Sequence, residues 1–459
     1  MDDDISSSRY TWSMESSYKE YFHGKRITLV GLGLLGRGVG DARFLASQGA
    51  DLIVTDLRKE EDLKESLNAL AEFPNIKYTL GTHDIADFQN RDLIINGAGV
   101  PLDSPYIAEA RKQRIPITMS TALFARFARA SNVPIVGVTG TRGKSTTTHL
   151  IAAILMQARK QVLLGGNVQG VSTLELLPEL TKDSIAVLEL DSWQLQGFRE
   201  EQLSPDIAVF TTFYPDHLNY YHHDMEAYLS DKAEIFLHQR PEDTLVLGAQ
   251  VAELIQAKYG TRIHAHCSIA SSKDIPSSWH LALPGEHSRS NVACAVAAAR
   301  ALHIPESDIQ AACETFRGVS GRLELLGELN GVSVYNDTTA TTPEATIAGL
   351  TALDPEKQKS IVLIMGGADK GLAMDALLQA IPEHCKAVLL LAGTGTDTIR
   401  TQIPGASVYS ALAEAFTAAR SIAQPGDTIL FSPAFASFGL FKNEYDRGEQ
   451  FTTLFQHAV

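Results

Sequence analysis

The chain has 459 residues, of which 44% are hydrophobic and 20% charged, the balance of a globular protein with room for about two to four domains. Its formal net charge of −15 is spread along the sequence, which argues against nucleic acid or an anionic membrane as the main partner, because both favour a basic surface. The four cysteines lie far apart, and no apolar run approaches the ~20 residues that span a bilayer, so we expect a soluble protein of the reducing cytoplasm.

Residues 1–22 are polar and Ser-rich, and we interpret them as a mobile tail. A strand at 26–30 then enters the glycine turn Gly31-Leu-Gly33-Leu-Leu-Gly36, and after a helix a second strand ends in Asp56. This order is typical of a nucleotide-binding βαβ unit, in which the turn meets a phosphate and the acid a ribose. Strands near 93–96 and 116–118 complete a first domain, residues 23–132. The pattern alone leaves open NAD, another nucleotide or a single phosphate group.

A second domain, residues 133–321, begins with an apolar run that breaks into a glycine-rich loop and an apolar helix. The loop is Gly140, Thr141, Arg142, Gly143, Lys144, Ser145 and Thr146. Such a loop indicates phosphate binding, because backbone N–H groups face the anion, the lysine reaches the outer phosphates and the serine suits magnesium. Strands expected at 161–164, 185–189 and 207–210, with helices between them, predict a mainly parallel sheet.

The alternation of strands and helices resumes from Arg322, after a crossing segment punctuated by glycines at 316–321. Strands are expected at 332–335, 361–364, 387–391 and 428–431, and they define a third domain, residues 322–459. The sequence therefore predicts an α/β protein of three domains in series, each with a mainly parallel sheet and flanking helices. The first and third are expected to be Rossmann-like and the central one P-loop ATPase-like.

Ligands of parallel α/β sheets gather at the carboxyl ends of the strands. That rule places four features of the second domain at one edge: the loop at Gly140, Asn167, Glu189 and the pair Asp216-His217. A phosphate loop, a carboxylate and an imidazole beside a serine hydroxyl predict a magnesium–ATP site. Taken alone, Glu189 is more often a solvated strand end and His217 a turn or core histidine, so the prediction depends on their shared edge.

Motifs along the chain resemble those of the Mur ligases of bacterial cell-wall synthesis. They are Gly137–Thr146, Gly165–Asn167, Leu188–Gln194, Asp216-His217, Gly321-Arg322, Tyr335–Asp337, Gly366–Lys370 and Ser432–Gly448. The resemblance covers nearly everything after the tail. It implies a cytoplasmic, monomeric enzyme that uses ATP and Mg²⁺ to add D-glutamate to UDP-N-acetylmuramoyl-L-alanine through an acyl phosphate, with small molecules as its partners.

The resemblance also implies roles for individual residues. The implied catalytic residues are Lys144, Glu189, His217, Lys232 and Arg322, and the metal ligands are Ser145, Glu189, His217 and a carbamylated Lys232. ATP would bind between the second and third domains, at Gly140, Thr141, Arg142, Gly143, Lys144, Ser145, Thr146, Asn291, Arg322 and Asp337. The UDP substrate would contact Gly33, Leu35, Gly36, Asp56, Arg58 and Asn167, and the amino acid Thr341, Lys370 and Ser437. By its helix position alone, Lys232 is expected to be an exposed lysine.

The chain departs from the family pattern near the substrates, at Leu35, Gly97-Ala98, Ser288, Gly321, Thr339 and Glu444. These departures spare the phosphate loop, the implied metal ligands and Arg322. They leave open whether D-glutamate, L-glutamate or another amino acid is added. An NAD-dependent dehydrogenase would explain Gly31 to Asp56 but not Lys144 or Glu189, and a catalytically silent ATP-binding module is a further alternative.

Overall fold

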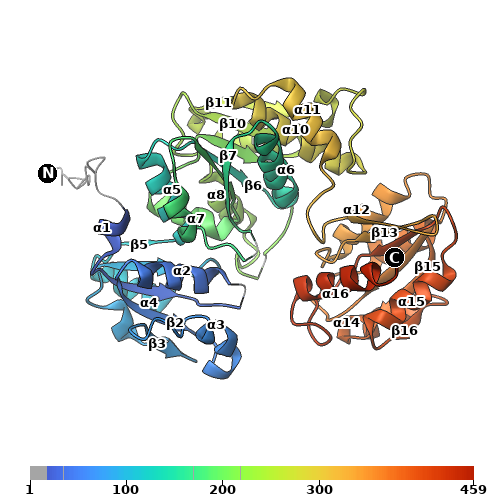
Figure 1. Cartoon of the computed structure of the whole chain (residues 1–459), viewed down its shortest axis with the longest axis horizontal. Coiled ribbons are helices and arrows are strands. Elements are labelled where there is room, and N and C mark those ends of the chain that lie inside the picture. Colours follow the sequence, from blue (N-terminus) through green and yellow to red (C-terminus); the bar gives the residue numbers. More distant parts are fainter. Residues whose placement is uncertain (1–17, 35, 169, 218) are drawn as a thin grey trace. The chain divides into compact units, whose positions relative to one another are not determined.

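The computed structural model describes residues 18–34, 36–168, 170–217 and 219–459. These residues fall into two compact units, one that runs to Ser271 and includes Ala293–Ile309, and one that includes Ser272–Val292 and Gln310–Val459. The first unit holds a five-stranded and a six-stranded sheet, and the second unit holds a six-stranded sheet (Figure 1). All three sheets are mainly parallel and flanked by helices, which confirms the predicted fold class.

The five-stranded sheet has the order β3-β2-β1-β4-β5, with every pair parallel. Its strands are β1 (Arg26–Val30), β2 (Asp51–Asp56), β3 (Lys77–Leu80), β4 (Leu93–Asn96) and β5 (Ile117–Thr118). The α-helices are α1 (Tyr18–Phe22), α2 (Arg37–Ser47), α3 (Lys64–Asn68), α4 (Pro105–Lys112) and α5 (Ser120–Ala130), with 3₁₀ turns η1 (Glu60–Leu63) and η2 (Ile85–Phe88). Central strands rich in Val, Ile and Leu are buried, as expected of a parallel sheet covered on both faces.

Helix α1 corrects the predicted extent of the tail. Phe22 is fully buried, and its ring meets that of Phe44 edge-on at 5.6 Å between centroids. The apolar area that these rings remove from water stabilises the short helix against the first sheet. Residues 18–22 are therefore part of the folded unit, whereas residues 1–17 lie outside the described residues.

The six-stranded sheet of the first unit has the order β11-β10-β9-β6-β8-β7 and is parallel throughout. Its strands are β6 (Ile135–Thr139), β7 (Gln161–Gly166), β8 (Ser184–Glu189), β9 (Ile207–Phe210), β10 (Thr244–Gly248) and β11 (His266–Ala270). The helices and turns that follow these strands are α6 (Lys144–Gln157), η3 (Leu174–Glu179), α7 (Ser192–Glu200), α8 (Met225–Ala233), α9 (Ala249–Tyr259), η4 (Gly260–Arg262) and η5 (Ser272–Asp274). Helices α10 (Glu286–Ala301) and α11 (Glu306–Thr315) come next in the chain.

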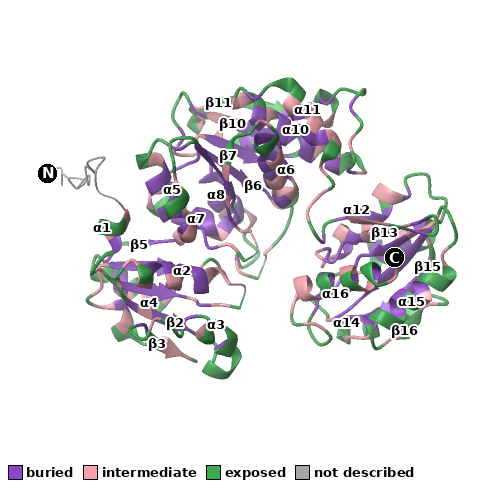
Figure 2. Ribbon diagram, viewed as in Figure 1, coloured by how far each residue is buried: buried purple, intermediate pink, exposed green. Residues whose placement is uncertain are grey.

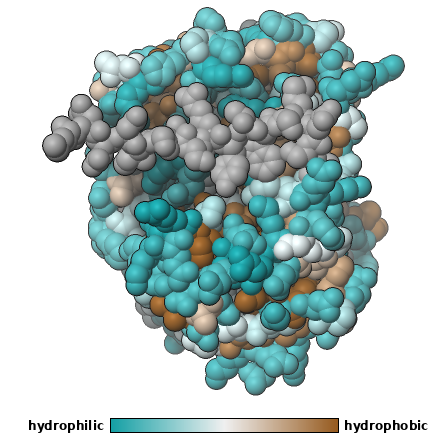
Figure 3. All heavy atoms as spheres, turned by 90° about the vertical axis from the view of Figure 1, so that its left-hand side faces the viewer, coloured by the Kyte–Doolittle hydropathy of each residue, from teal (hydrophilic) through white to brown (hydrophobic). Residues whose placement is uncertain are grey.

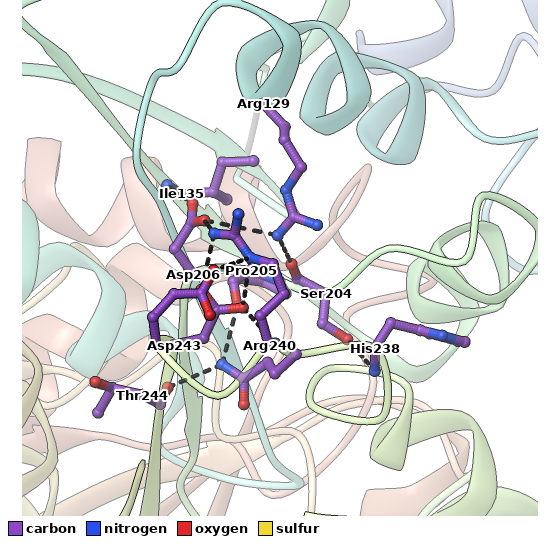
Figure 4. Close-up of polar contacts among 11 residues, drawn as sticks. Arg129, Ile135, Ser204, Pro205, Asp206, His238, Arg240, Asp243 and Thr244 are labelled. Carbon is purple, nitrogen blue, oxygen red and sulfur yellow. Dashed lines mark hydrogen bonds and ion pairs between the residues drawn. The ribbon is translucent and has the colours of Figure 1, made fainter. Parts of the chain in front are cut away.

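A polar network ties together the amino ends of β6, β9 and β10 (Figure 4). Asp206 accepts the backbone N–H of Ile135 at 2.8 Å and a guanidinium N–H of Arg240 at 3.1 Å. Arg240 also pairs with Asp243 at 3.0 Å, while Arg129 from α5 donates to the Ser204 carbonyl oxygen. This network holds the amino ends of the three strands together. Ligands of parallel α/β sheets bind at the opposite, carboxyl edge, where the loops after the strands lie.

The sheet of the second unit has the order β12-β13-β17-β14-β15-β16, and only β12 runs antiparallel to its neighbour among the described strands. Its strands are β12 (Glu324–Leu329), β13 (Val332–Asn336), β14 (Ile361–Gly366), β15 (Cys385–Leu391), β16 (Ser407–Tyr409) and β17 (Thr428–Phe431). The flanking helices are α12 (Pro343–Leu353), α13 (Asp375–His384), α14 (Thr394–Ile399), α15 (Leu412–Ile422) and α16 (Glu444–Gln456), with η6 at Arg400–Gln402.

Burial follows the sheets. Figure 2 shows the central strands of each sheet as mostly buried, with exposed residues on the outer sides of the helices and in the loops. On the face drawn in Figure 3, hydrophobic side chains form small separate groups between hydrophilic ones. In the part of the chain that the structure describes, no helix is both long and apolar enough to cross a membrane.

Candidate active site

The phosphate loop follows β6, whose neighbours in the sheet are β9 and β8. Gly140 has a φ of 144° and lies against Thr211 and Thr212, so a side chain at Gly140 would collide with them. Gly143 has a φ of 86° and begins α6 without a side-chain cap. The first N–H groups of α6 therefore lack a capping side chain, and together with the helix dipole they favour an anion at this position.

The segment after β9 holds this loop in shape. Backbone N–H of Thr141 donates to the Thr212 carbonyl oxygen at 2.7 Å, and backbone N–H of Arg142 donates to the Thr212 hydroxyl at 3.0 Å. The Thr211 hydroxyl donates to the Arg142 carbonyl oxygen at 2.6 Å. The loop is thus bonded into one conformation before any ligand binds, which lowers the entropy cost of binding.

Two lysines converge on one carbonyl oxygen of the loop. Lys144 Nζ donates to the carbonyl oxygens of Gly140 at 3.0 Å and Thr141 at 3.2 Å, and Lys232 Nζ donates to Gly140 at 2.9 Å. Lys232 is 1% exposed, so the expectation of an exposed lysine is wrong. Burial, and next the charge of Lys144, lower the pKa of Lys232 well below its ordinary value.

Helix α8 buries Lys232 because the neighbouring residue ties this helix to α7. Asp231 accepts Gln196 Nε2 at 2.6 Å and Arg199 Nη2 at 2.5 Å, and it also accepts the Tyr221 hydroxyl at 3.0 Å. Because these hydrogen bonds hold Asp231 against α7, the side chain of the next residue, Lys232, is directed at the phosphate loop. Lys232 Nζ also lies 4.8 Å from the centroid of the Tyr228 ring.

Glu189 ends β8 beside the phosphate loop and is 2% exposed. Asn167, which follows β7, donates its backbone N–H to the Glu189 carbonyl oxygen at 2.7 Å and its side-chain Nδ2 to Glu189 Oε1 at 3.2 Å. The pairing of Gly166 with Glu189 in the sheet explains this approach. The structure therefore brings Asn167, Glu189 and the phosphate loop to the same edge.

His217 lies in the loop after β9 with a φ of 52°, and its ring centroid is 4.5 Å from that of Trp193. Burial lowers the pKa of His217. The charge of Asp216 acts to raise this pKa, and the charges of Lys144 and Lys232 act to lower it further. A neutral imidazole is the form that binds metals. Trp193, whose ring packs against that of His217, lies in the motif Leu188–Gln194, but the motif alone does not indicate this contact.

The glycine turn of the first sheet is held by Asp56. Its Oδ2 accepts the backbone N–H groups of Leu32 at 2.9 Å and Gly33 at 3.0 Å, and its Oδ1 accepts that of Arg58 at 2.8 Å. Gly36 is the N-cap residue just before α2, with a φ of 84° and no side-chain cap. Asp56 thus shapes the turn through its own hydrogen bonds, whereas a nucleotide-binding fingerprint assigns it to a ribose. Leu35 lies outside the described residues.

In the second unit, Asp337 follows β13 and uses both oxygens within the fold. It accepts the Leu323 backbone N–H at 2.9 Å and the Ser432 hydroxyl at 2.8 Å. Burial raises the pKa of Asp337 to about 7, against the lowering effect of these hydrogen bonds. Arg322, next to Leu323, is exposed, and Asn291 is a buried residue of α10.

The three residues expected at the amino acid lie on loops at the carboxyl edge of the second unit's sheet. Lys370 Nζ donates to the Thr341 hydroxyl at 3.0 Å. Reciprocal backbone bonds between Ala368 and Ala436, at 2.9 and 3.1 Å, bring the Lys370 loop beside that of Ser437, which is buried. The structure therefore gathers all three residues in one loop cluster.

Arg447, at 0% exposure on α16, joins two of these loops, a role that the motif at Ser432–Gly448 does not indicate by itself. It donates to the Thr338 carbonyl oxygen at 2.8 Å, the Thr338 hydroxyl at 3.1 Å and the Phe435 carbonyl oxygen at 3.3 Å. Burial lowers its pKa to about 10. A charged residue beside a glycine near a helix start is a weak signal, because nothing local in the sequence indicates which loops its side chain reaches.

Three domain models match the chain in order. They are the N-terminal domain of MurD-like Mur ligases at residues 25–119, the Mur ligase middle domain at 138–299 and the Mur ligase glutamate ligase domain at 321–435. The UDP-N-acetylmuramoylalanine–D-glutamate ligase of Roseiflexus sp. (strain RS-1) is 41% identical over 93% of this chain and 97% of its own length. The enzyme of the same name from Anaeromyxobacter dehalogenans (strain 2CP-C) is 35% identical over 94% of this chain and 97% of its own length.

Solved structures agree at the level of the fold. The UDP-N-acetylmuramate-alanine ligase MurC of Thermotoga maritima has a TM-score of 0.59 at 20% identity and covers 95% of this chain and 100% of its own. The MurF ligase of the same organism, solved in complex with ADP, has a TM-score of 0.58 at 16% identity, with 88% and 94% coverage. From the matched domain models and from relatives above 30% identity along nearly its whole length, this chain belongs to the Mur ligase family.

Proposed function

We propose that this chain is an ATP-dependent ligase that joins the carboxyl group of UDP-N-acetylmuramoyl-L-alanine to the amino group of D-glutamate for cell-wall synthesis. The observation that carries the proposal is the convergence of Lys144 and Lys232 on Gly140, beside the buried Glu189. The names and the high coverage of the relatives supply the substrates.

The phosphate loop supports phosphoryl transfer from ATP to the carboxylate. A carboxylate resists attack by an amine until one oxygen is phosphorylated, after which phosphate can leave. Lys144 is held by two neutral carbonyl oxygens, and a terminal phosphate is a stronger, charged partner for the same ammonium. Through that contact Lys144 stabilises the charge on the transferring phosphoryl oxygens. The amine of glutamate then attacks the acyl phosphate, and phosphate departs.

The donors around the loop fit Mg²⁺. No group of three or more His, Cys, Asp or Glu side chains in the described ranges is arranged to hold a metal by itself. Magnesium commonly relies on substrate phosphates with one or two protein oxygens, and Ser145 and Glu189 offer those oxygens. Bound there, the ion would neutralise charge on the phosphates. His217, kept neutral by burial, would complete a second set of ligands with Lys232.

Lys232 fits carbamylation because an uncharged amine is the form that reacts with CO₂. The nitrogen of the uncharged amine bonds to the carbon of CO₂ and releases one proton, and the side chain becomes an anionic carbamate with oxygen ligands. Its pKa, lowered by burial and by Lys144, keeps the amine uncharged over a wider pH range than usual. The neighbouring charge of Lys144 would in turn favour the carbamate.

The remaining site residues keep their proposed roles. Gly33, Gly36, Arg58 and Asn167 would meet the UDP substrate, with Asp56 shaping the turn, and Arg322, Asp337 and Asn291 would serve ATP. Both carboxylate oxygens of Asp337 already accept hydrogen bonds, so Asp337 would serve ATP by holding its loop in shape and not by direct contact. Thr341, Lys370 and Ser437 would meet the amino acid, since a lysine and hydroxyls suit a dicarboxylate. A monomeric state and a cytoplasmic location are part of the proposal.

The experiment that tests the proposal is incubation with UDP-N-acetylmuramoyl-L-alanine, ATP and one amino acid at a time. D-glutamate should give a product of the condensed mass together with phosphate release, and L-glutamate, alanine and a diamino acid should give neither. Product with L-glutamate instead would favour the alternative ligase. Tight NADH binding without any ligation would favour the dehydrogenase that the glycine turn alone allows.

A further inference from the structure

Arg37, the first residue of α2, links the glycine turn of the first sheet to the site beside the second sheet. Its Nη1 donates to Asn167 Oδ1 at 2.7 Å, and Asn167 Nδ2 donates to Glu189 Oε1 at 3.2 Å. Three side chains from α2, the loop after β7 and the end of β8 thus form one hydrogen-bonded series that ends on the proposed metal carboxylate.

The chemistry of the three groups sets the direction of this series. A guanidinium only donates hydrogen bonds, and an ionised carboxylate only accepts them, whereas a side-chain amide has one end of each kind. Arg37 fixes the oxygen end of the Asn167 amide, so the nitrogen end must face Glu189. Without Arg37 the amide can reverse, and its oxygen would then repel the Glu189 carboxylate.

The helix that carries Arg37 is docked firmly enough to hold this position. Asp41 accepts the Ser172 hydroxyl at 2.6 Å in a buried contact, and Arg43 pairs with Glu175 at 3.2 Å. At Gly40 an added Cβ would stand 2.5 Å from the Ser172 Cβ, so the backbone of α2 lies directly against the segment after β7. Arg37 is therefore presented to Asn167 from a rigid base.

We propose that Arg37 is a positioning residue, which orients the Asn167 amide and thereby holds the Glu189 carboxylate in the position that receives the metal. The inference rests on the proposed function, in which Glu189 is a metal ligand. Groups that orient a metal ligand without touching the metal commonly change metal affinity or activity by about 10–100-fold when they are removed.

The test is the affinity of the full-length protein for Mn²⁺ in the presence of ADP, followed by the electron paramagnetic resonance signal of free Mn²⁺. Arg37→Met should weaken Mn²⁺ binding by about 10-fold, and Arg37→Lys, which can still donate to Asn167, should recover part of the loss. Arg43→Met is the matched control, because it removes an arginine contact of the same helix with the same segment, and its affinity should stay at the wild-type value.

A double variant separates positioning from general loosening. Because Arg37 acts through Asn167, adding Arg37→Met to Asn167→Ala should cause no further loss of Mn²⁺ affinity. Three results would each overturn the inference while wild-type ligation stays intact. They are additive losses of Mn²⁺ affinity in the double variant, a wild-type Mn²⁺ affinity in Arg37→Met, and a loss of Mn²⁺ affinity in Arg43→Met equal to that in Arg37→Met. A wild-type protein that neither binds Mn²⁺ with ADP nor forms product would refute the proposed function, and the inference with it.

Discussion

Lys144 and Lys232 donate to the same acceptor, the Gly140 carbonyl oxygen, at 3.0 and 2.9 Å. Two ammonium groups at one neutral oxygen repel each other, and this repulsion is the largest cause after burial of the lowered pKa of Lys232. The arrangement favours an uncharged Lys232 beside the phosphate loop. A buried amine of this kind adds little to stability, so we attribute its position to chemistry.

Lys144→Ala should reduce product formation by at least about 100-fold, because the variant lacks the cation that we propose stabilises the transferring phosphoryl group. The fold should persist, since the loop keeps its hydrogen bonds to Thr211 and Thr212. Phosphate release in a coupled assay measures the rate, and circular dichroism checks the fold. Turnover close to the wild-type value would defeat the assigned role.

Lys232→Met should raise the free energy of unfolding of the first unit at about pH 7 in CO₂-free buffer, while it abolishes ligation. The folded pKa of Lys232 is lowered, so between that pKa and its ordinary value the unfolded chain holds a proton that the folded chain lacks, and wild-type stability rises with pH. The advantage of the methionine variant should therefore shrink from about pH 7 to about pH 10.

Denaturant titrations at several pH values measure this difference, and Lys160→Met, at an exposed position, is the control. The control should show no pH-dependent difference from wild type. An advantage for Lys232→Met that stays constant with pH would contradict the lowered pKa.

Asp337→Asn should flatten the pH dependence of the stability of the second unit. Burial raises the pKa of Asp337 to about 7, whereas an unfolded aspartate titrates near about 3.9, so in this window the folded unit holds a proton that the unfolded chain has lost. Wild-type stability should fall with rising pH through the window, by up to about 1.4 kcal/mol per pH unit from this group. Calorimetry at about pH 4 to about pH 8 tests the slope, and Asp375→Asn, at an exposed carboxylate of α13, should leave it unchanged.

Arg447→Met should destabilise the second unit and raise the KM for the amino acid more than it lowers kcat. The substitution leaves the carbonyl oxygens of Thr338 and Phe435 without this donor, at a cost of about 1–3 kcal/mol for each oxygen left unpaired. The loops that carry Thr341 and Ser437 would then lose a shared anchor. Calorimetry and steady-state kinetics measure the two effects, and the exposed Arg420→Met serves as control. A KM equal to that of wild type would separate Arg447 from the amino-acid loops.

The fold was largely predictable because its strands are continuous apolar runs between glycine turns. Strands at 26–30, 93–96, 207–210 and 428–431 have the predicted bounds, and the second strand ends at Asp56 as predicted. Strands β3, β10, β11, β12 and β16 were not predicted. Strands β3 and β11 are exposed along much of their length and lack a continuous apolar run, whereas β10 is a buried apolar run that was nevertheless missed. Helix α1 was missed because a single buried ring, that of Phe22, stabilises it through contacts distant in sequence.

The edge shared by Gly140, Asn167 and Glu189 was predictable from one rule about parallel sheets. The burial of Lys232 was not, because helical periodicity does not indicate which neighbouring loop covers a polar face. The Arg37 contact was hidden for a related reason, since it joins residues 130 positions apart. Such contacts depend on how the first sheet docks on the second, which no local pattern encodes.

The most direct test of carboxylate activation follows an oxygen isotope. UDP-N-acetylmuramoyl-L-alanine labelled with oxygen-18 in its alanine carboxylate is incubated with ATP and D-glutamate, and the released phosphate is examined by mass spectrometry. Phosphorylation of the carboxylate predicts that each phosphate formed with product carries a labelled oxygen. Product accompanied only by unlabelled phosphate would contradict the account.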